Sequence, residues 1–190
     1  MSRDFSLAFF FFSLVACSPA PDYSQAVQEF QGHKNAGNVE LALNMFADEP
    51  NLQFGPLGTI SGLNEIRGIL EYDLALNTQL RLERCEAAAF EVTCRVTETN
   101  DWLRLVDIES ITYAENKFIF ATDGRIESIS ATLSAESGQL LGAAMAQFDA
   151  WAKINCPIDY ADLFSEDGAF VYSRENGEKV LALLRQWRKE

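Results

Sequence analysis

Residues 117–126 read KFIFATDGRI and contain the clearest signal for a β-hairpin in the chain. Their Asp123-Gly124 dipeptide is a strong turn signal between two extended segments. Working outward from that turn, the pattern predicts one strand from about residue 110 to 121 and a second from about 125 to 133. The centre of the chain therefore carries a hairpin.

Two earlier segments show the same period of two. Leu80 and Leu82 alternate with polar neighbours, and so do the residues of the stretch FEVTCRV at 90–96. Both stretches predict half-buried strands. Residues 101–107 interrupt them and predict a short helical or irregular crossing, so that the four strands follow one another as an antiparallel sheet.

Helical patterns lie on both sides of this sheet. We expect helices over about 22–36, from residue 38 to the Asp-Glu-Pro sequence at 48–50, and from residue 61 onward, with a brief strand at 52–54. Three more helices are expected after residue 134. Helices, then strands, then helices indicate an α+β fold rather than an alternating parallel one.

The amino-acid composition excludes two classes of protein. The 190 residues are 48% hydrophobic and 12% aromatic, which excludes a mainly disordered chain. The formal net charge of -13 excludes a nucleic-acid binder, because phosphate neutralisation needs clustered basic residues.

The first residues predict where in the cell the protein is located. A charged start and an apolar stretch over residues 5–16 have the layout of a secretory signal peptide, too short for a spanning helix. The sequence Leu14-Val15-Ala16-Cys17 resembles a bacterial lipobox, in which residues 1–16 are removed and Cys17 carries the acyl chains, such as palmitate. Residues 17–21 would then be a lipidated tether. The alternative is an ordinary signal peptide with a chance cysteine, and Asp4 near the start supports that alternative.

The predicted location follows from this motif. Several acyl chains on one residue anchor a protein stably, so membrane contact is expected through the lipid alone. Since Ser18 rather than an aspartate follows Cys17, the resemblance to lipoproteins of bacteria with two membranes implies the outer membrane, facing the periplasm.

Three further cysteines would lie in that oxidising compartment. We expect a disulfide between Cys85 and Cys94, which flank the hairpin turn, and a buried thiol at Cys156. Strict alternation places Cys85 on the face opposite to Leu82, whereas Cys94 shares its face with Val96. A β-bulge near the turn would reconcile the two.

Element order and short motifs together resemble the nuclear transport factor 2-like, or SnoaL-like, family. The resemblance covers residues 22–133 and rests on GTISGLNEIR at 58–67, opening a helix, and on the hairpin motif at 118–126. It implies a cone, in which a curved antiparallel sheet wraps around the N-terminal helices and leaves a pocket at its open end. Residues 134–190 would be an extra helical extension packed on the same domain.

This fold hosts enzymes as well as binding and assembly modules, so the resemblance does not decide the function. The first hypothesis is a lipid-anchored protein that binds a small apolar or amphipathic molecule. One alternative is a cofactor-free lyase or isomerase that uses a pocket carboxylate; another is an envelope scaffold or homodimer. Whether the protein is an enzyme stays open at this point.

The candidate pocket residues are one carboxylate and four aromatic side chains. Glu98 continues the inward row of the strand at 90–96, although a strand end that emerges into solvent explains it more simply. The aromatic candidates are Trp102, Tyr113, Phe118 and Phe120. A pocket acid such as Glu98 with Tyr113 would suit general acid–base chemistry, but no catalytic motif of the family matches residue by residue.

No cofactor or metal site is predicted. His33 is the only histidine, on a segment that reads as solvated, and no carboxylate spacing resembles a calcium loop. A glycine-rich phosphate loop and a nucleophile elbow are both missing from the sequence.

Overall fold

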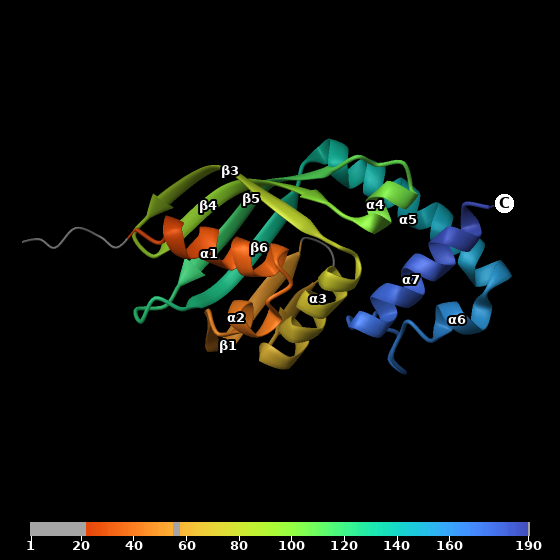
Figure 1. The fold of residues 1–190 in the computed structure, drawn as a ribbon, viewed down its shortest axis with the longest axis horizontal. Helices are drawn as coiled ribbons and strands as arrows, with labels where there is room; N and C mark the ends of the chain where they lie inside the picture. The colour runs from red at the N-terminus through yellow and green to blue at the C-terminus, as the bar shows by residue number, and fades with distance from the viewer. Residues whose placement is uncertain (1–21, 55–57, 190) are drawn as a thin grey trace, which may run out of the picture.

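The computed structural model describes residues 22–54 and 58–189 (Figure 1). The predicted signal peptide, Cys17 and the tether lie outside them. The helices are α1 (Ser24–Asn35), α2 (Val39–Leu43), α3 (Leu63–Ala75), α4 (Asp101–Leu105), α5 (Ala135–Asn155), α6 (Pro157–Ala161) and α7 (Arg174–Trp187). The strands are β1 (Phe46–Phe54), β2 (Thr59–Ser61), β3 (Gln79–Ala88), β4 (Glu91–Thr99), β5 (Ile111–Phe120) and β6 (Ile126–Leu133).

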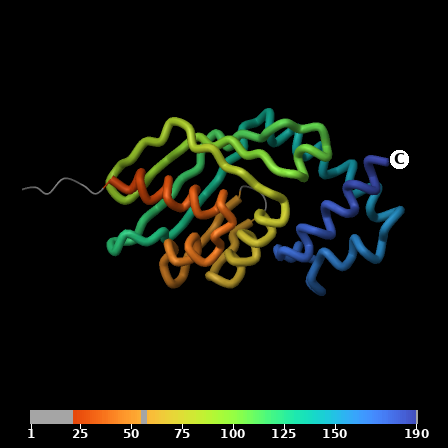
Figure 2. Tube along the Cα trace, in the orientation of Figure 1, coloured from red at the N-terminus to blue at the C-terminus, as the bar shows by residue number. Residues whose placement is uncertain are grey.

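The strands form one curved sheet in the order β2-β1-β6-β5-β4-β3. Helices α1, α2 and α3 lie along one face of this sheet, while α5, α6 and α7 gather at one end of the molecule (Figures 1 and 2). The predicted α+β cone with extra C-terminal helices is confirmed. One detail differs, because β1 pairs with β6 in parallel, whereas all other neighbours are antiparallel.

The second helix is shorter, and the strand after it longer, than the sequence predicts. Helix α2 ends at Leu43, and β1 already begins at Phe46, whose side chain is only 3% exposed. Pro50 lies inside β1 rather than ending a helix. The pairing of β1 with β6 shifts register between Phe46 and Asn51, so the proline occupies an irregular part of the strand, where its missing N–H is tolerated.

The hairpin of β3 and β4 carries the predicted disulfide. Cys85 and Cys94 are bonded, and the register shifts between Glu83 and Glu86. Arg84, at the shift, has a φ of 49°. This bulge turns Cys85 toward Cys94, so both the disulfide and the irregularity that it requires are confirmed.

Side-chain hydrogen bonds fasten α1 to the edge of the sheet. The Asn35 amide donates to the carbonyl oxygen of Leu80 and accepts from its N–H, each at 2.8 Å, as a neighbouring strand would. The side chain of Gln79 donates to the carbonyl oxygen of Asn35 at 3.1 Å. The C-terminal turn of α1, which includes Lys34, is thereby held over β3.

The buried apolar side chains form two clusters. The cone core lies between the sheet and the first three helices, and its members are Val27, Phe30, Ala42, Leu43, Phe46, Leu52, Ile66, Ile69, Leu70, Val92, Cys94, Val96, Phe118, Phe120, Ile126 and Ile129. The helical core joins α4 to the C-terminal helices, and its members are Leu76, Trp102, Leu103, Ile108, Ile111, Phe148, Ala152, Tyr160, Leu163, Val180, Leu181, Leu183 and Leu184.

Helix α7 packs closely on α3 where the two cores meet. A Cβ atom at Gly177 would lie 2.7 Å from the Cβ of Ala75, so only glycine allows this approach. None of the helices in the described part of the chain is both long and apolar enough to span a membrane.

Candidate functional site

A cavity of about 520 Å³ lies inside the cone. Most of its walls are apolar side chains of α1, α3, β1, β5 and β6. Residues Ser134 to Met145, at the end of β6 and along α5, supply a further wall, and Tyr172 closes the side next to α7. The polar or charged side chains in these walls are Lys34, Tyr72, Asp73, Glu98, Tyr113, Asn116, Thr132, Ser134 and Tyr172.

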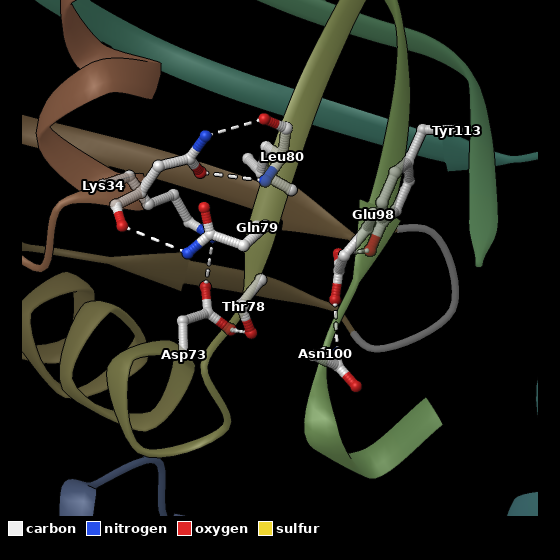
Figure 3. A network of polar contacts seen from close by, with 9 residues as sticks. Lys34, Asp73, Thr78, Gln79, Leu80, Glu98, Asn100 and Tyr113 are labelled. Carbon is white, nitrogen blue, oxygen red and sulfur yellow. Dashed lines mark hydrogen bonds and ion pairs between the residues drawn. The ribbon is translucent and has the colours of Figure 1, made fainter. Parts of the chain in front are cut away.

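Glu98 presents a hydrogen-bonded carboxyl group to this cavity (Figure 3). The hydroxyl of Tyr113 donates to its Oε2 at 2.9 Å, and Nδ2 of Asn100 donates to its Oε1 at 2.8 Å. The Asn100 amide is itself fixed, because its Oδ1 caps α4 by accepting from the N–H of Leu103 at 2.7 Å. The carboxyl group is therefore held in one orientation by two neighbouring elements.

The surroundings raise the pKa of Glu98 above that of an ordinary glutamate. Burial is the main cause, because it disfavours the charged form, and the negative charge of Asp73 adds to it. The charge of Lys34 and the two hydrogen bonds act in the opposite direction without cancelling the effect. Burial, followed by the adjacent Glu98, also raises the pKa of Tyr113 well above its usual value, so this phenol keeps its proton.

An ion pair lies in the same wall as Glu98. Nζ of Lys34 is 2.7 Å from Oδ2 of Asp73, and the two side chains are only 11% and 21% exposed. Figure 3 shows this pair beside β3 and Glu98 on β4. Because the two charges compensate each other, the site near Glu98 is polarised but carries little additional net charge.

Two tyrosines connect the cavity to the C-terminal helices. Tyr72 and Tyr172 pack edge to face with ring centroids 5.4 Å apart. Burial is the first cause of the raised pKa of each phenol. Both hydroxyl groups are therefore neutral, and they add polarity to the cavity wall without charge.

The structure brings three of the five predicted pocket residues to the cavity. Glu98, Tyr113 and Phe118 are in its wall. Glu98 is half-buried, lines the cavity and accepts two side-chain hydrogen bonds, so it is not simply a strand end that emerges into solvent.

Trp102 and Phe120 are not among the lining residues, and for them the prediction needs correction. Trp102 belongs to the helical core, because α4 turns its ring toward the C-terminal helices. Phe120 points inward as expected, but Tyr23 of the segment before α1 stacks on its ring at 4.4 Å. That contact seals this end of the cone.

Sequence reasoning missed several polar groups of the site. Lys34 lies on the segment that reads as solvated, Asp73 was not considered, and nothing in their spacing indicates that they face each other across α1 and α3. The bulge that turns Asn116 inward was also missed, as was the contribution of α5. His33 is outside the cavity wall. Cys156 is a free thiol as predicted, but the prediction that it is buried is wrong, because its side chain is partly exposed.

The described residues offer no set of side-chain ligands for a metal ion. Among residues 22–54 and 58–189, no three His, Cys, Asp or Glu side chains are grouped so that they could hold a metal ion.

Comparison with known proteins identifies the fold. No protein-family model matches the sequence, and no curated protein matches it significantly. Among solved structures, the chain is similar to the epoxide hydrolase/cyclase-like enzyme SalBIII, which has a role in pyran ring formation in the polyether salinomycin. The two chains are 14% identical, with a TM-score of 0.53 over 60% of this chain and 91% of SalBIII.

Two further structures show the same likeness. A protein from Kribbella flavida is 13% identical, with a TM-score of 0.53 over 66% of this chain and 95% of that one. A protein from Catenulispora acidiphila with a ketosteroid isomerase-like fold, solved with trimethylamine, is 15% identical, with a TM-score of 0.50 over 60% and 88%. At these identities the likeness concerns the fold alone: the described chain has the α+β cone of the nuclear transport factor 2-like and ketosteroid isomerase-like proteins.

Proposed function

We propose that the cavity binds an apolar or amphipathic small molecule and that Glu98 transfers a proton on it, which makes the protein a cofactor-free isomerase or lyase. One observation carries this proposal: a carboxyl group with a raised pKa is held by a tyrosine in the wall of a mainly apolar cavity. Such a group is a stronger base than a solvated carboxylate, and its raised pKa is closer to neutral pH, where general acid–base catalysis is most effective.

The proposed step is balanced within the substrate and Glu98. The substrate of this step is a carbonyl compound with a carbon–carbon double bond one carbon further along the chain. The carboxylate removes a proton from the carbon between the two groups, the C–H electron pair forms a new carbon–carbon double bond, and the carbonyl π pair moves onto oxygen. When the carbonyl group reforms, the far carbon of the original double bond takes the proton back from Glu98, so the double bond moves and no oxidant or reductant is needed. Tyr113 and Asn100 each occupy one lone-pair position of the two carboxylate oxygens, which leaves further positions for the substrate proton.

Simple binding remains the second candidate function, because most of the cavity wall is apolar. A protein that only binds its ligand does not need a carboxyl group with a raised pKa. Binding alone therefore does not explain Glu98. An envelope scaffold or homodimer needs no cavity, so a cone filled with side chains would suit that function better. The epoxide hydrolase/cyclase-like enzyme SalBIII, which has a similar fold, is an example of this cone in an enzyme.

Exchange of carbon-bound protons tests the enzyme proposal without knowledge of the natural substrate. We would incubate 2-tetralone, a bicyclic ketone with acidic α-protons, in D₂O with the protein and follow loss of the α-proton signals by NMR. We expect saturable acceleration that the Glu98→Gln variant abolishes. Glu115→Gln is the matched control, since Glu115 lies on β5 but is exposed. Binding of the ketone with equal exchange in all three proteins would contradict catalysis and favour the binder.

We also propose that the protein is held at the membrane by acyl chains on Cys17. The support is the lipobox-like sequence at the end of the apolar stretch. Replacing Cys17 by Ser should release the protein from the membrane fraction of an expressing bacterium, while Cys156→Ser should leave it there. Retention of the Cys17 variant would contradict the proposal, and retention in the inner membrane would contradict the outer-membrane assignment.

A further inference from the structure

A second polar side chain in the cavity lacks the partner that its burial requires. Asn116 lies in the cavity wall and is 7% exposed. In the part of the chain that the structure describes, its Oδ1 is fully buried and accepts no hydrogen bond. An unpaired buried carbonyl oxygen is unfavourable, so native proteins contain few of them, and each calls for an explanation.

A bulge in β5 is responsible for the position of Asn116. Tyr113 is opposite Val96 and Asn116 is opposite Cys94, so β5 has one residue more than β4 between these pairs. Strict alternation from Tyr113 would point Glu115 inward; instead Glu115 is exposed and Asn116 is buried. Bulges next to active sites commonly re-aim a side chain in this way.

The neighbours of Asn116 do not supply a donor. Its Cα partners across the sheet are Cys94, which is in the disulfide, and Ala131, and the next inward side chain along β5 is Phe118. The amide therefore occupies an apolar part of the wall, between that ring and the Glu98–Tyr113 pair. Along an extended strand, three residues from Tyr113 correspond to roughly 10 Å at most.

We infer that Asn116 is a specificity-determining anchor for a hydroxyl group of the ligand. Oδ1 itself has almost no accessible surface, so a half-turn of the amide, which exchanges Oδ1 and Nδ2, brings the oxygen to the cavity, where it accepts a hydrogen bond from that hydroxyl. The ligand is then an apolar molecule with a hydroxyl group within about 10 Å of the atom that faces Glu98. The inference rests on the proposed function, because it assumes that the cavity holds an apolar ligand. It adds the chemical feature that selects one apolar molecule over another.

Two probes of nearly the same shape test the anchor. 2-Naphthol carries a hydroxyl group where 2-methylnaphthalene carries a methyl group, and both fluoresce, so binding can be titrated directly. We expect the protein to bind 2-naphthol about three- to tenfold more tightly, the range of one neutral hydrogen bond. The Asn116→Leu variant should lose this preference, and Glu98→Gln should keep it.

The outcomes separate the two proposals. Equal affinity of the wild type for both probes, or a preference that survives in Asn116→Leu, would overturn the anchor and leave the proposed function standing. A preference lost in Glu98→Gln but kept in Asn116→Leu would assign the hydroxyl to Glu98 and also overturn the anchor. Failure of both probes to bind the wild type would contradict the proposed function together with the anchor.

The ligand-free protein gives an independent readout. If Asn116 is kept for a ligand, replacing it by Leu removes an unpaired buried amide, and the Tm should rise by about 2–4 °C. A fall in Tm would show that the amide stabilises the fold, and this would overturn the inference even if the wild type preferred 2-naphthol.

Discussion

The cone core and the helical core each have a buried asparagine nearby, and the two asparagines differ in their hydrogen bonding. In the helical core, Nδ2 of Asn176 donates to the carbonyl oxygens of Leu163 and Val171 at 3.2 and 2.8 Å. In the cone core, Asn116 faces a cavity and its Oδ1 is unpaired among the described residues. One asparagine ties three segments of chain together, whereas the other leaves hydrogen-bonding capacity unused.

The same contrast extends to the apolar side chains. Leu163 and Leu184 of the helical core are at most 1% exposed, and neither is in the wall of the cavity. Leu52 of the cone core is equally apolar but lines the cavity. A well-packed core and a hollow one therefore lie in one chain, which indicates that the hollow is a property of the cone and not of poor packing throughout.

The largest expected effect compares two leucines. Replacing Leu184 by Ala should lower the free energy of unfolding by about 3–5 kcal/mol, because the surrounding helices cannot fill the space. Replacing Leu52 by Ala should lower it by about 2 kcal/mol, since part of its surface already faces a cavity and loses no contacts. Urea denaturation of both variants checks the order. Equal losses would break the distinction between a filled and a hollow core.

The two asparagines give a smaller effect with opposite signs. Asn176→Leu should destabilise the protein by about 2 kcal/mol, because it removes the side-chain donor of the Val171 carbonyl oxygen and one of the two donors of the buried Leu163 carbonyl oxygen, which keeps only the N–H of Val171. Asn116→Leu should stabilise it, for the reason given above. Thermal denaturation of both variants under one set of conditions decides the matter, and destabilisation by both would remove the contrast between the cores.

A substitution on α5 distinguishes the cavity wall from a helix surface away from the cavity. A Cβ atom at Gly142 would meet nothing within 4 Å, and the residue lies in the cavity wall. Gly142→Leu should add about 1 kcal/mol of stability through helix propensity while it fills the space beside α5, so that affinity for 2-methylnaphthalene falls. Gly32→Leu on α1 is the matched control: its Cβ also meets nothing, but it is away from the cavity. Unchanged affinity in Gly142→Leu would show that α5 does not bound the binding site.

The smallest expected effect is a change in the pH dependence of stability. Because the pKa of Glu98 is raised on folding, the folded protein binds this proton more tightly than the unfolded chain. Stability from this group therefore falls as pH rises from the ordinary glutamate pKa through the raised one. Glu98→Gln should remove that loss, so its Tm should exceed that of the wild type at pH 7, and the difference should shrink toward pH 4. A difference that grows on acidification would contradict the raised pKa.

Most of the cone could be predicted because its signals are local. The Asp123-Gly124 turn and the alternating rows of the strands determine the sheet, and the conflict between Cys85 and Cys94 even required the bulge that the structure contains. The start of β1 was missed because Pro50 resembles a helix stop. Its actual place depends on pairing with β6, some 80 residues further along the chain.

The site was less predictable because its surroundings come from distant segments. Alternation placed Glu98 on the inward face, but whether that strand end meets solvent depends on α4 and on Tyr172 near α7. Phe120 was excluded from the cavity by Tyr23, and Asn116 was turned inward by a bulge that has no signature in the sequence. Contacts between elements, not residue patterns, decided which inward side chains reach the cavity.

The titration of Glu98 shows whether this residue is a buried base in a ligand cavity. The carboxyl carbons of the glutamates can be followed by ¹³C NMR across pH, and the signal that is lost in Glu98→Gln assigns this residue. We predict that Glu98 titrates above the ordinary glutamate value of 4.5 and that its midpoint moves when an apolar probe binds. A midpoint at or below that value, unchanged by the probe, would contradict the account of Glu98 as a buried base in a ligand cavity.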